Sequence, residues 1–313
     1  MNYFFLLLLL LCSSVVFGQQ DYLAYYQQLN QGKLAALDGR MDSAVQYYHN
    51  TFERFEFVFA RDVMHAIQLA AQAKDSIQLP YFLELALKKG ISIDELRNIN
   101  DLIDYKEASF WTPLEKKADS LHTIYNQSVN WEIREIINEF LTEDQKVRDR
   151  YYSTPFWKRR KIGKEWEALN RQQIEKMIDI THQYGFPGEK LIGWDDQQMH
   201  PKLNGKRLSA GAPIVIFIHH YSQPNPSVDS LLFDQVKLGN LYNEHFATIC
   251  DFEAKFGKAK YPTLGYFGWK HTDDAILPAK YDERRRKIGL LSLCDQMRLD
   301  NAQILTSFWR HLY

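Results

Sequence analysis

Apolar residues recur at every third or fourth position over most of the chain, which is the spacing of amphipathic helices. Between residue 21 and about residue 100, short turn signals separate several such runs. In the segment LDGRMDSAVQYYHNTFERF, Gly39 is expected to end one helix and Asp42 to cap the next. A later helix is expected to open at Pro80 and to close at Gly90. These residues therefore predict antiparallel pairs of helices.

Small residues mark the places where these helices are expected to approach closely. Gly39 with Ala44, an alanine-rich helix after them, and Ala86 with Gly90 resemble the pattern of tetratricopeptide repeats. Such repeats stack pairs of helices into a curved array, so the resemblance implies a concave surface for a protein or peptide partner. A helical bundle that packs against the second half of the chain is the alternative. The sequence leaves both open.

The second half also shows helical spacing, and helices are predicted at residues 114–125, 131–150, 164–184, 230–238, 242–256 and 294–312. The segment APIVIFIHHY, at residues 212–221, has strand propensity, but its short apolar run is also compatible with a buried helix. We therefore predict a mainly α protein, with a helical-hairpin domain at residues 19–125 and a mostly helical second domain at residues 126–313. An α+β second domain is the alternative.

The amino-terminal segment predicts export. Residues 3–17 form a nearly unbroken apolar run, shorter than the roughly 20 residues that span a bilayer, and Gly18 supplies a small residue for cleavage. Residues 1–18 are therefore predicted to be a signal peptide, and the mature chain to be periplasmic or secreted. Leu10 and Leu11 before Cys12 argue against a lipid anchor, and no second apolar run reaches membrane length.

The net charge limits the classes of binding partner, and the cysteine content limits the possible disulfides. A net charge of -1 gives no reason to expect nucleic acid, although KRRK at residues 158–161 and RRRK at residues 284–287 are locally basic. A partner with carboxylates or phosphates stays open. After removal of the signal peptide, Cys250 and Cys294 allow one disulfide, and two separate buried thiols are the preferred interpretation.

No known catalytic, phosphate-binding or zinc-binding signature occurs, so no cofactor is predicted. The residues His219, His220, His245, Asp251 and Asp144 are of the types that bind a divalent metal, but their spacing matches no metal motif. Histidine at the end of an apolar run is more often a hydrogen-bonded packing residue. No metal site is therefore predicted.

Several segments of the second half follow one another in an order and spacing that resemble a bacterial domain of unknown function, family 6624. They are DQKVR at 144–148, Asn170, YGFPGEKLIG at 184–193, His220, HFATICD at 245–251 and YDERRRKIGL at 281–290. The resemblance covers roughly residues 135–295 and implies a mainly helical domain. It singles out Asp144, Gln145, Arg148, Asn170, Gly185, Pro187, Gly188, His220, Ala247, Asp251, Asp282, Arg284, Arg285 and Gly289. The chain departs from the family pattern at residues 251–252 and 261–266, and the family transfers no reaction.

On this basis Asp144, Arg148, His220, Arg284 and Arg285 are expected to converge in one buried cluster. Such a cluster must be hydrogen-bonded internally, since an unpaired buried charge costs several kcal/mol. The alternative is an exposed pair of Asp144 and Arg148, four residues apart on a helix, with the Arg284 group solvated.

Two classes of function follow. The preferred one is a non-enzymatic exported binding or scaffold protein. The other is a hydrolase-like enzyme, in which His220 is the general base, Asp144 orients it, and Arg148 or Arg284 stabilises negative charge. Further candidate binding residues are Asn170, His245, Asp251 and Asp282.

Overall fold

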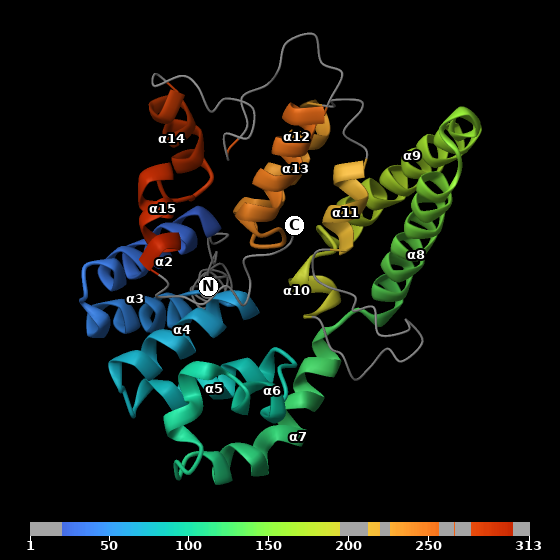
Figure 1. Ribbon diagram of the computed structural model, residues 1–313. Helices are drawn as coiled ribbons and strands as arrows, with labels where there is room; N and C mark the ends of the chain where they lie inside the picture. The colour runs from blue at the N-terminus through green and yellow to red at the C-terminus, as the bar shows by residue number, and fades with distance from the viewer. Residues whose placement is uncertain (1–20, 195–211, 220–225, 257–265, 267–276, 303–313) are drawn as a thin grey trace, which may run out of the picture.

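The computed structural model describes residues 21–194, 212–219, 226–256, 266 and 277–302. Every regular element in this part of the chain is a helix, which confirms the predicted mainly α fold (Figure 1). The ambiguous segment APIVIFIHHY contributes helix α11 (Ala212–His219), so the α+β alternative has no support from the described residues.

The first half of the chain is a series of helical hairpins. Its elements are α2 (Tyr22–Leu37), α3 (Met41–Arg54), α4 (Ala60–Ala73), α5 (Gln78–Lys88), α6 (Ile93–Arg97), the 3₁₀-helix η1 (Asn100–Tyr105) and α7 (Trp111–Ser128). From α2 to α5 each helix packs against the next, and α5 also packs against α7. The predicted helix pairs are therefore present, while their assignment to tetratricopeptide repeats stays a prediction.

Close approach between these helices depends on small residues. A Cβ at Gly32 would lie 2.9 Å from the ring of Tyr48, so α2 and α3 touch where glycine leaves room.

Two predicted boundaries are wrong. The residue before α3 is Arg40, with Asp42 inside the first turn, and α5 begins at Gln78, two residues before Pro80. Polar residues and proline are both favoured within the first turn of a helix, so the observed start can precede such a residue by one or two positions.

The second half begins with a long antiparallel hairpin of α8 (Trp131–Ser153) and α9 (Arg159–Tyr184), joined by the 3₁₀-helix η2 (Phe156–Lys158). After it come α10 (Glu189–Ile192), α11, α12 (Pro226–Lys237), α13 (Asn243–Phe256), α14 (Leu277–Lys287) and α15 (Leu293–Ala302). Helix α11 packs against α8, α9 and α13. It therefore connects the base of the hairpin to the rest of the molecule (Figure 1).

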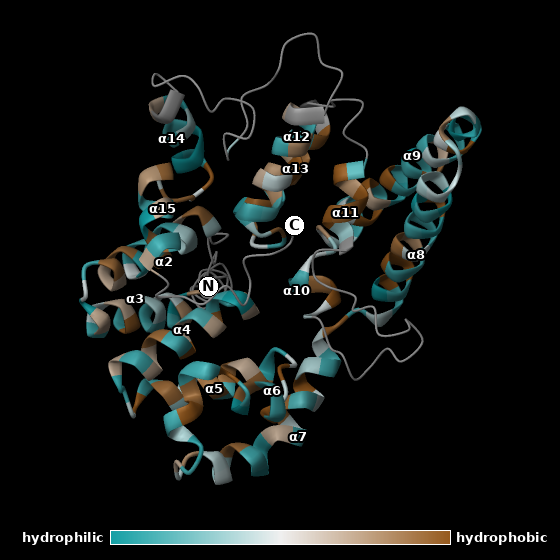
Figure 2. Cartoon of the chain, in the orientation of Figure 1, coloured by the Kyte–Doolittle hydropathy of each residue, from teal (hydrophilic) through white to brown (hydrophobic). Residues whose placement is uncertain are grey.

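The two halves share one hydrophobic core, which runs from Tyr22 to Leu299. Helix α2 packs against both α12 and α15, and the rings of Tyr26 and Tyr242 meet edge to face at 5.5 Å. Apolar residues are dense along α11, as the brown ribbon of Figure 2 shows. The predicted domain boundary at residue 125 falls within α7. The division into two domains stays a prediction.

Several predictions concern residues outside the described part of the chain. They are the signal peptide at residues 1–18, His220, the segment 261–265, and the end of the last helix at residues 303–312. Among the described helices, none combines the length and the apolar character that crossing a bilayer requires. Cys250 and Cys294 are both free thiols, as preferred from the sequence, but the prediction that both are buried is wrong, because Cys294 is exposed.

Candidate functional site

Asp144 lies at the centre of a polar cluster between α8, α9 and α11. Its side chain is 0 % exposed. Trp166 on α9 donates from Nε1 to Oδ1 at 2.7 Å, and Gln145 donates from Nε2 to Oδ2 at 2.9 Å. His219, the last residue of α11, places Nδ1 at 2.9 Å from Oδ2 and 3.0 Å from Oδ1. Three donors from three helices therefore meet one carboxylate.

The orientation of His219 follows from the chemistry of its partner. An ionised carboxylate only accepts hydrogen bonds, so Nδ1 must carry the proton and Nε2 keeps its lone pair. In the described part of the chain Nε2 has no hydrogen-bond partner, and the side chain is 17 % exposed. The ring packs edge to face on Trp166 at 5.4 Å, which fixes its plane. The result is an oriented imidazole whose Nε2 has no partner among the described residues.

Asn170 supports the same cluster from α9. Its Nδ2 donates to the backbone carbonyl of His219 at 3.3 Å, which satisfies one of the last carbonyl groups of α11. The residue is 6 % exposed, and among the described residues its buried Oδ1 has no hydrogen-bond partner. Asn170 therefore belongs to the site that the sequence predicted, where it positions α11.

His220 and Arg148 are two other residues that the sequence predicted to lie beside Asp144. His220 lies outside the described residues, and the histidine that contacts Asp144 is its neighbour, His219. The predicted pair of Asp144 and Arg148 is wrong, because Arg148 directs NH1 to Gln145 Oε1 at 3.4 Å and lies 3.9 Å from Asp149. Arg148 is exposed, where solvent competes for its guanidinium.

Arg285 is buried in a second place, at 1 % exposure on α14. It donates from Nε to the carbonyl of Leu291 at 2.5 Å and from NH1 to the carbonyl of Tyr266 at 2.9 Å. The buried Asp251 accepts from the backbone N–H of Tyr266, so both side chains hold that residue. Burial lowers the pKa of Arg285. This second cluster fixes backbone around α14.

The residues that were expected to form one cluster therefore lie in two separate clusters. Helices α8 and α14 lie on opposite sides of the molecule in Figure 1. Arg284 lies near Arg285, with its guanidinium 4.9 Å from the centre of the Tyr266 ring. Asp282 accepts from the backbone N–H of Leu293 at 2.7 Å, at the first residue of α15. The convergence of Arg284 and Arg285 with Asp144 is wrong because these groups stabilise their own neighbouring segments.

His245, the remaining predicted binding residue, lies on α13. Burial, and then the neighbouring Arg61, lower its pKa to about 3, so the imidazole is neutral at physiological pH. Its ring is 5.7 Å from the ring of Tyr242. Within the described residues, no three side chains of His, Cys, Asp or Glu are placed to share a metal ion.

A second fully buried carboxylate was missed from the sequence. Asp62 on α4 is 0 % exposed and accepts from Tyr25 Oη at 2.8 Å and from Tyr242 Oη at 3.0 Å. Burial raises its pKa, and the nearby Lys33 and Arg61 oppose that rise. The sequence did contain a signal for this group. Asp62, His65 and Gln68 are spaced by three on an otherwise apolar helix, and all three are buried.

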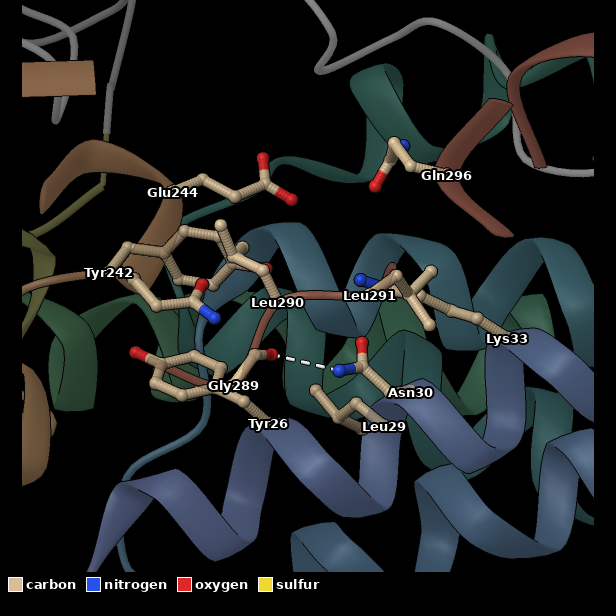
Figure 3. A pocket seen from close by; sticks show the side chains of 11 residues that line it. Tyr26, Leu29, Asn30, Lys33, Tyr242, Glu244, Gly289, Leu290, Leu291 and Gln296 are labelled. Carbon is tan, nitrogen blue, oxygen red and sulfur yellow. Dashed lines mark hydrogen bonds between the residues drawn. The ribbon is translucent and has the colours of Figure 1, made fainter. Parts of the chain in front are cut away.

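A small cavity lies next to this group, between α2 and the start of α13 (Figure 3). Lys33, Glu244, Asn30 and Gln296 supply its polar lining, and Asn30 donates to the carbonyl of Gly289 at 2.8 Å. Burial lowers the pKa of Lys33. The cavity volume is about 10 Å³, which is room for about one water molecule. It is too small for an organic substrate.

Glu189 is another buried carboxyl that sequence reasoning missed. Its Oε1 accepts from the backbone N–H of Ala60 at 2.8 Å, at the first residue of α4, where the helix dipole favours negative charge. Burial still raises the pKa of Glu189 to about 7, against the attraction of Lys89. Lys89 has its own pKa lowered to about 8 by burial, and its amine lies 3.6 Å from the centre of the Phe57 ring.

A pair of carboxyl groups with raised pKa values lies between α12 and α13. Burial, and then the charge of Asp229, raise the pKa of Glu253 to about 7, and burial also raises that of Asp229. The thiol of Cys250 has a raised pKa from the same causes, which makes it a poor nucleophile. The charge of Arg284 opposes the rise at Asp229 without cancelling it.

Comparisons of the chain with protein-family models, with curated proteins and with solved structures find no match. The resemblance to family 6624 therefore stays a prediction, and the site rests on its geometry.

Proposed function

We propose that the protein is a non-enzymatic, exported binding or scaffold protein. The main support is that the buried charged side chains form hydrogen bonds with other groups of the protein itself. Asp62 accepts from two tyrosines, Glu189 from a helix amide, and Arg285 donates to two carbonyls. Asp62 and Glu189 join segments that are far apart in the chain, and Arg285 holds nearby backbone, so these side chains serve the protein's own fold.

Arg134 on α8 follows the same rule. It is 1 % exposed and donates from NH1 to the carbonyl of Ile192 at 2.6 Å and to that of Trp194 at 2.7 Å. The ring of Trp131 lies 5.4 Å from its guanidinium carbon. A buried cation without such partners is strongly destabilising, so this arrangement holds the segment after α10 against the base of α8.

The part of the scaffold that meets a partner is proposed to be the far end of the α8–α9 hairpin. The base of the hairpin packs against α10 and α11, while Phe156 and Trp157 at its far end are 76 % and 68 % exposed. The helical hairpins of the first half are less suitable, because Glu189 and Tyr242 from the second half already contact Ala60 and Asp62 on α4.

A hydrolase-like enzyme is the second candidate, and one observation favours it. Asp144 orients His219 and leaves Nε2 available, as a general base requires. In this version His219 replaces His220 as the base. Arg148 and Arg284 have no place in it, because Arg148 contacts Gln145 and Arg284 lies at the Tyr266 ring of the second cluster.

Turnover of activated esters and phosphate esters distinguishes the two candidates. The scaffold proposal predicts the same background rate for the wild type and for His219→Ala, together with a loss of folding stability in the variant. The enzyme predicts the reverse, because removal of a catalytic group commonly leaves stability unchanged or raised. A turnover that depends on His219 in a fully folded variant would overturn the scaffold proposal. Trp166→Phe is the matched control, since it removes one donor to Asp144 and keeps the imidazole.

A further inference from the structure

The turn between α8 and α9 exposes an unusual set of aromatic side chains. Tyr152, Phe156 and Trp157 are 58 %, 76 % and 68 % exposed, and they lie within six residues of one another. Single exposed apolar residues need no explanation, but several at one end of a hairpin indicate an interaction surface, and the rings of Phe156 and Trp157 are in contact at 5.1 Å. We call Tyr152, Phe156 and Trp157 the aromatic end of the hairpin.

The backbone under the aromatic end is held in place by Arg159. Its Nε donates to the carbonyl of Thr154 at 2.7 Å, and its NH2 donates to that of Tyr152 at 3.0 Å. An ion pair of Arg150 and Glu165 joins the two helices just below. Because these contacts fix the turn before any partner arrives, little ordering is required on binding.

The charge around the aromatic end is strongly positive. Residues 148–161 contain six basic side chains and one acidic side chain, a net charge of +5, although the whole chain carries -1. Lys158, Arg160 and Lys161 are all exposed, next to the aromatic rings. A partner surface must therefore be anionic and must also accept apolar rings.

The placement of the hairpin restricts the shape of that partner. In Figure 1 the turn between α8 and α9 lies at the end of the molecule farthest from α2 and α15. A broad flat surface can therefore reach the aromatic end without first meeting the other helices.

We propose that the aromatic end of the α8–α9 hairpin docks on the surface of an anionic lipid bilayer. Tryptophan and other aromatic rings favour the interface between headgroups and acyl chains, and nearby Lys and Arg are attracted to anionic headgroups. The inference rests on the proposed function, in which this end of the scaffold meets a partner. Single-stranded nucleic acid is disfavoured, because the whole chain carries a net charge of -1 and affinity for phosphate backbones comes mainly from excess Lys and Arg.

Vesicle flotation of the mature chain tests the proposal. That chain begins at Gln19 and keeps every described helix. The wild type is expected to bind vesicles that contain phosphatidylglycerol, and to bind less at high salt. Phe156→Ala with Trp157→Ala is expected to lower the partition coefficient on the order of tenfold, from the apolar area lost. Lys158→Gln, Arg160→Gln and Lys161→Gln together are expected to lower it on the order of a hundredfold, on anionic vesicles only.

Matched controls use equally exposed residues elsewhere. Ile77→Ala with Ile103→Ala removes apolar groups that are 79 % and 59 % exposed, and Arg40→Gln, Arg286→Gln and Lys287→Gln remove the same charge. Both sets are expected to bind as the wild type does.

Three results would overturn the docking proposal. They are no vesicle binding by the wild type, equal losses in control and hairpin variants, and hairpin-dependent binding of a single-stranded oligonucleotide without vesicle binding. The scaffold proposal fails through a different result, the turnover dependent on His219, so the two failures are distinguishable.

Discussion

Asp62 and Asp144 are both carboxylates with 0 % exposure, yet their surroundings differ. Asp62 is enclosed by two tyrosine hydroxyls, from α2 and from the residue before α13. Asp144 is enclosed on one side by Trp166 and Gln145, and on the other by His219, which is 17 % exposed. The two partners of Asp62 are themselves buried, whereas His219 beside Asp144 is partly exposed.

The difference shows that burial of a charge does not by itself indicate a reactive site. At Asp62 the hydrogen bonds connect α4 to both halves of the chain, so their loss must weaken the whole core. At Asp144 they hold three helices at the base of the hairpin, where His219 can instead be hydrated. The following substitutions test this contrast, from the largest expected effect to the smallest.

Asp62→Ala is expected to lower the free energy of unfolding by about 3–5 kcal/mol. It leaves two buried hydroxyl groups without an acceptor and removes the negative charge beside Lys33. Denaturant unfolding followed by circular dichroism measures the change. Tyr242→Phe, which removes one donor only, should cost roughly 1 kcal/mol. A loss below that value for Asp62→Ala would contradict a central role for this carboxylate.

Glu189→Gln tests a third buried carboxyl group through the pH dependence of the free energy of unfolding. Burial raises the pKa of Glu189 from 4.5 to about 7, so the folded state keeps a proton that the unfolded state has released. The free energy of unfolding of the wild type should therefore fall by roughly 2–4 kcal/mol, relative to Glu189→Gln, as the pH rises from about 4.5 to about 7. Lys89 stays protonated over this window, since its pKa is about 8.

Glu84→Gln is the matched control for that titration. Lys117 and Lys88 lower the pKa of the Glu84 carboxyl, so its stabilising contribution is lost as the pH falls, which is the opposite sign. Parallel pH dependence in the wild type and in Glu189→Gln would show that Glu189 ionises normally.

Asp144→Asn is expected to lower the free energy of unfolding by about 1–3 kcal/mol. The amide places its own donor against donors from His219, Trp166 and Gln145, and at least one of them loses its acceptor. Urea unfolding is again the measurement. Asp149→Asn, whose side chain is 69 % exposed, should change stability by less than about 0.5 kcal/mol. Equal effects of the two changes would show that the cluster is not a stabilising one.

His219→Gln should have the smallest effect, about 1 kcal/mol or less. The imidazole is partly exposed, so water compensates for part of the lost contact with Asp144. Proton exchange of the Trp166 indole N–H provides a local readout, and it should become faster in this variant. An effect as large as that of Asp62→Ala would remove the contrast between the two carboxylates.

The fold could be predicted well because helical periodicity is a local property of the sequence. Boundaries were less accurate where local signals compete. Helix α9 begins at Arg159 instead of residue 164, because the basic run at 158–161 is helical although it carries no apolar spacing. The carbonyls before it are satisfied by the Arg159 side chain, a contact that sequence patterns do not reveal.

The site could be predicted only in part, for a physical reason. Asp144 was predicted to lie beside a histidine, and Asn170 was predicted only as a binding residue, but the histidine that contacts Asp144 is His219 and not the predicted His220. Adjacent residues on a helix point in different directions. Whether His219 or its neighbour faces Asp144 depends on how α11 is rotated against α8, which is set by packing. Asp62 was missed because its partners lie 37 and 180 residues away in the chain.

A double-mutant cycle of Asp144→Asn and His219→Gln tests most directly whether the buried charges of this protein serve its structure. The cycle measures the free energy of unfolding of the wild type, both single variants and the double variant at neutral pH. We predict a coupling energy of about 1 kcal/mol between the two side chains. Additive effects within about 0.3 kcal/mol, together with a hydrolytic activity lost in both single variants, would contradict a structural role and favour a catalytic one.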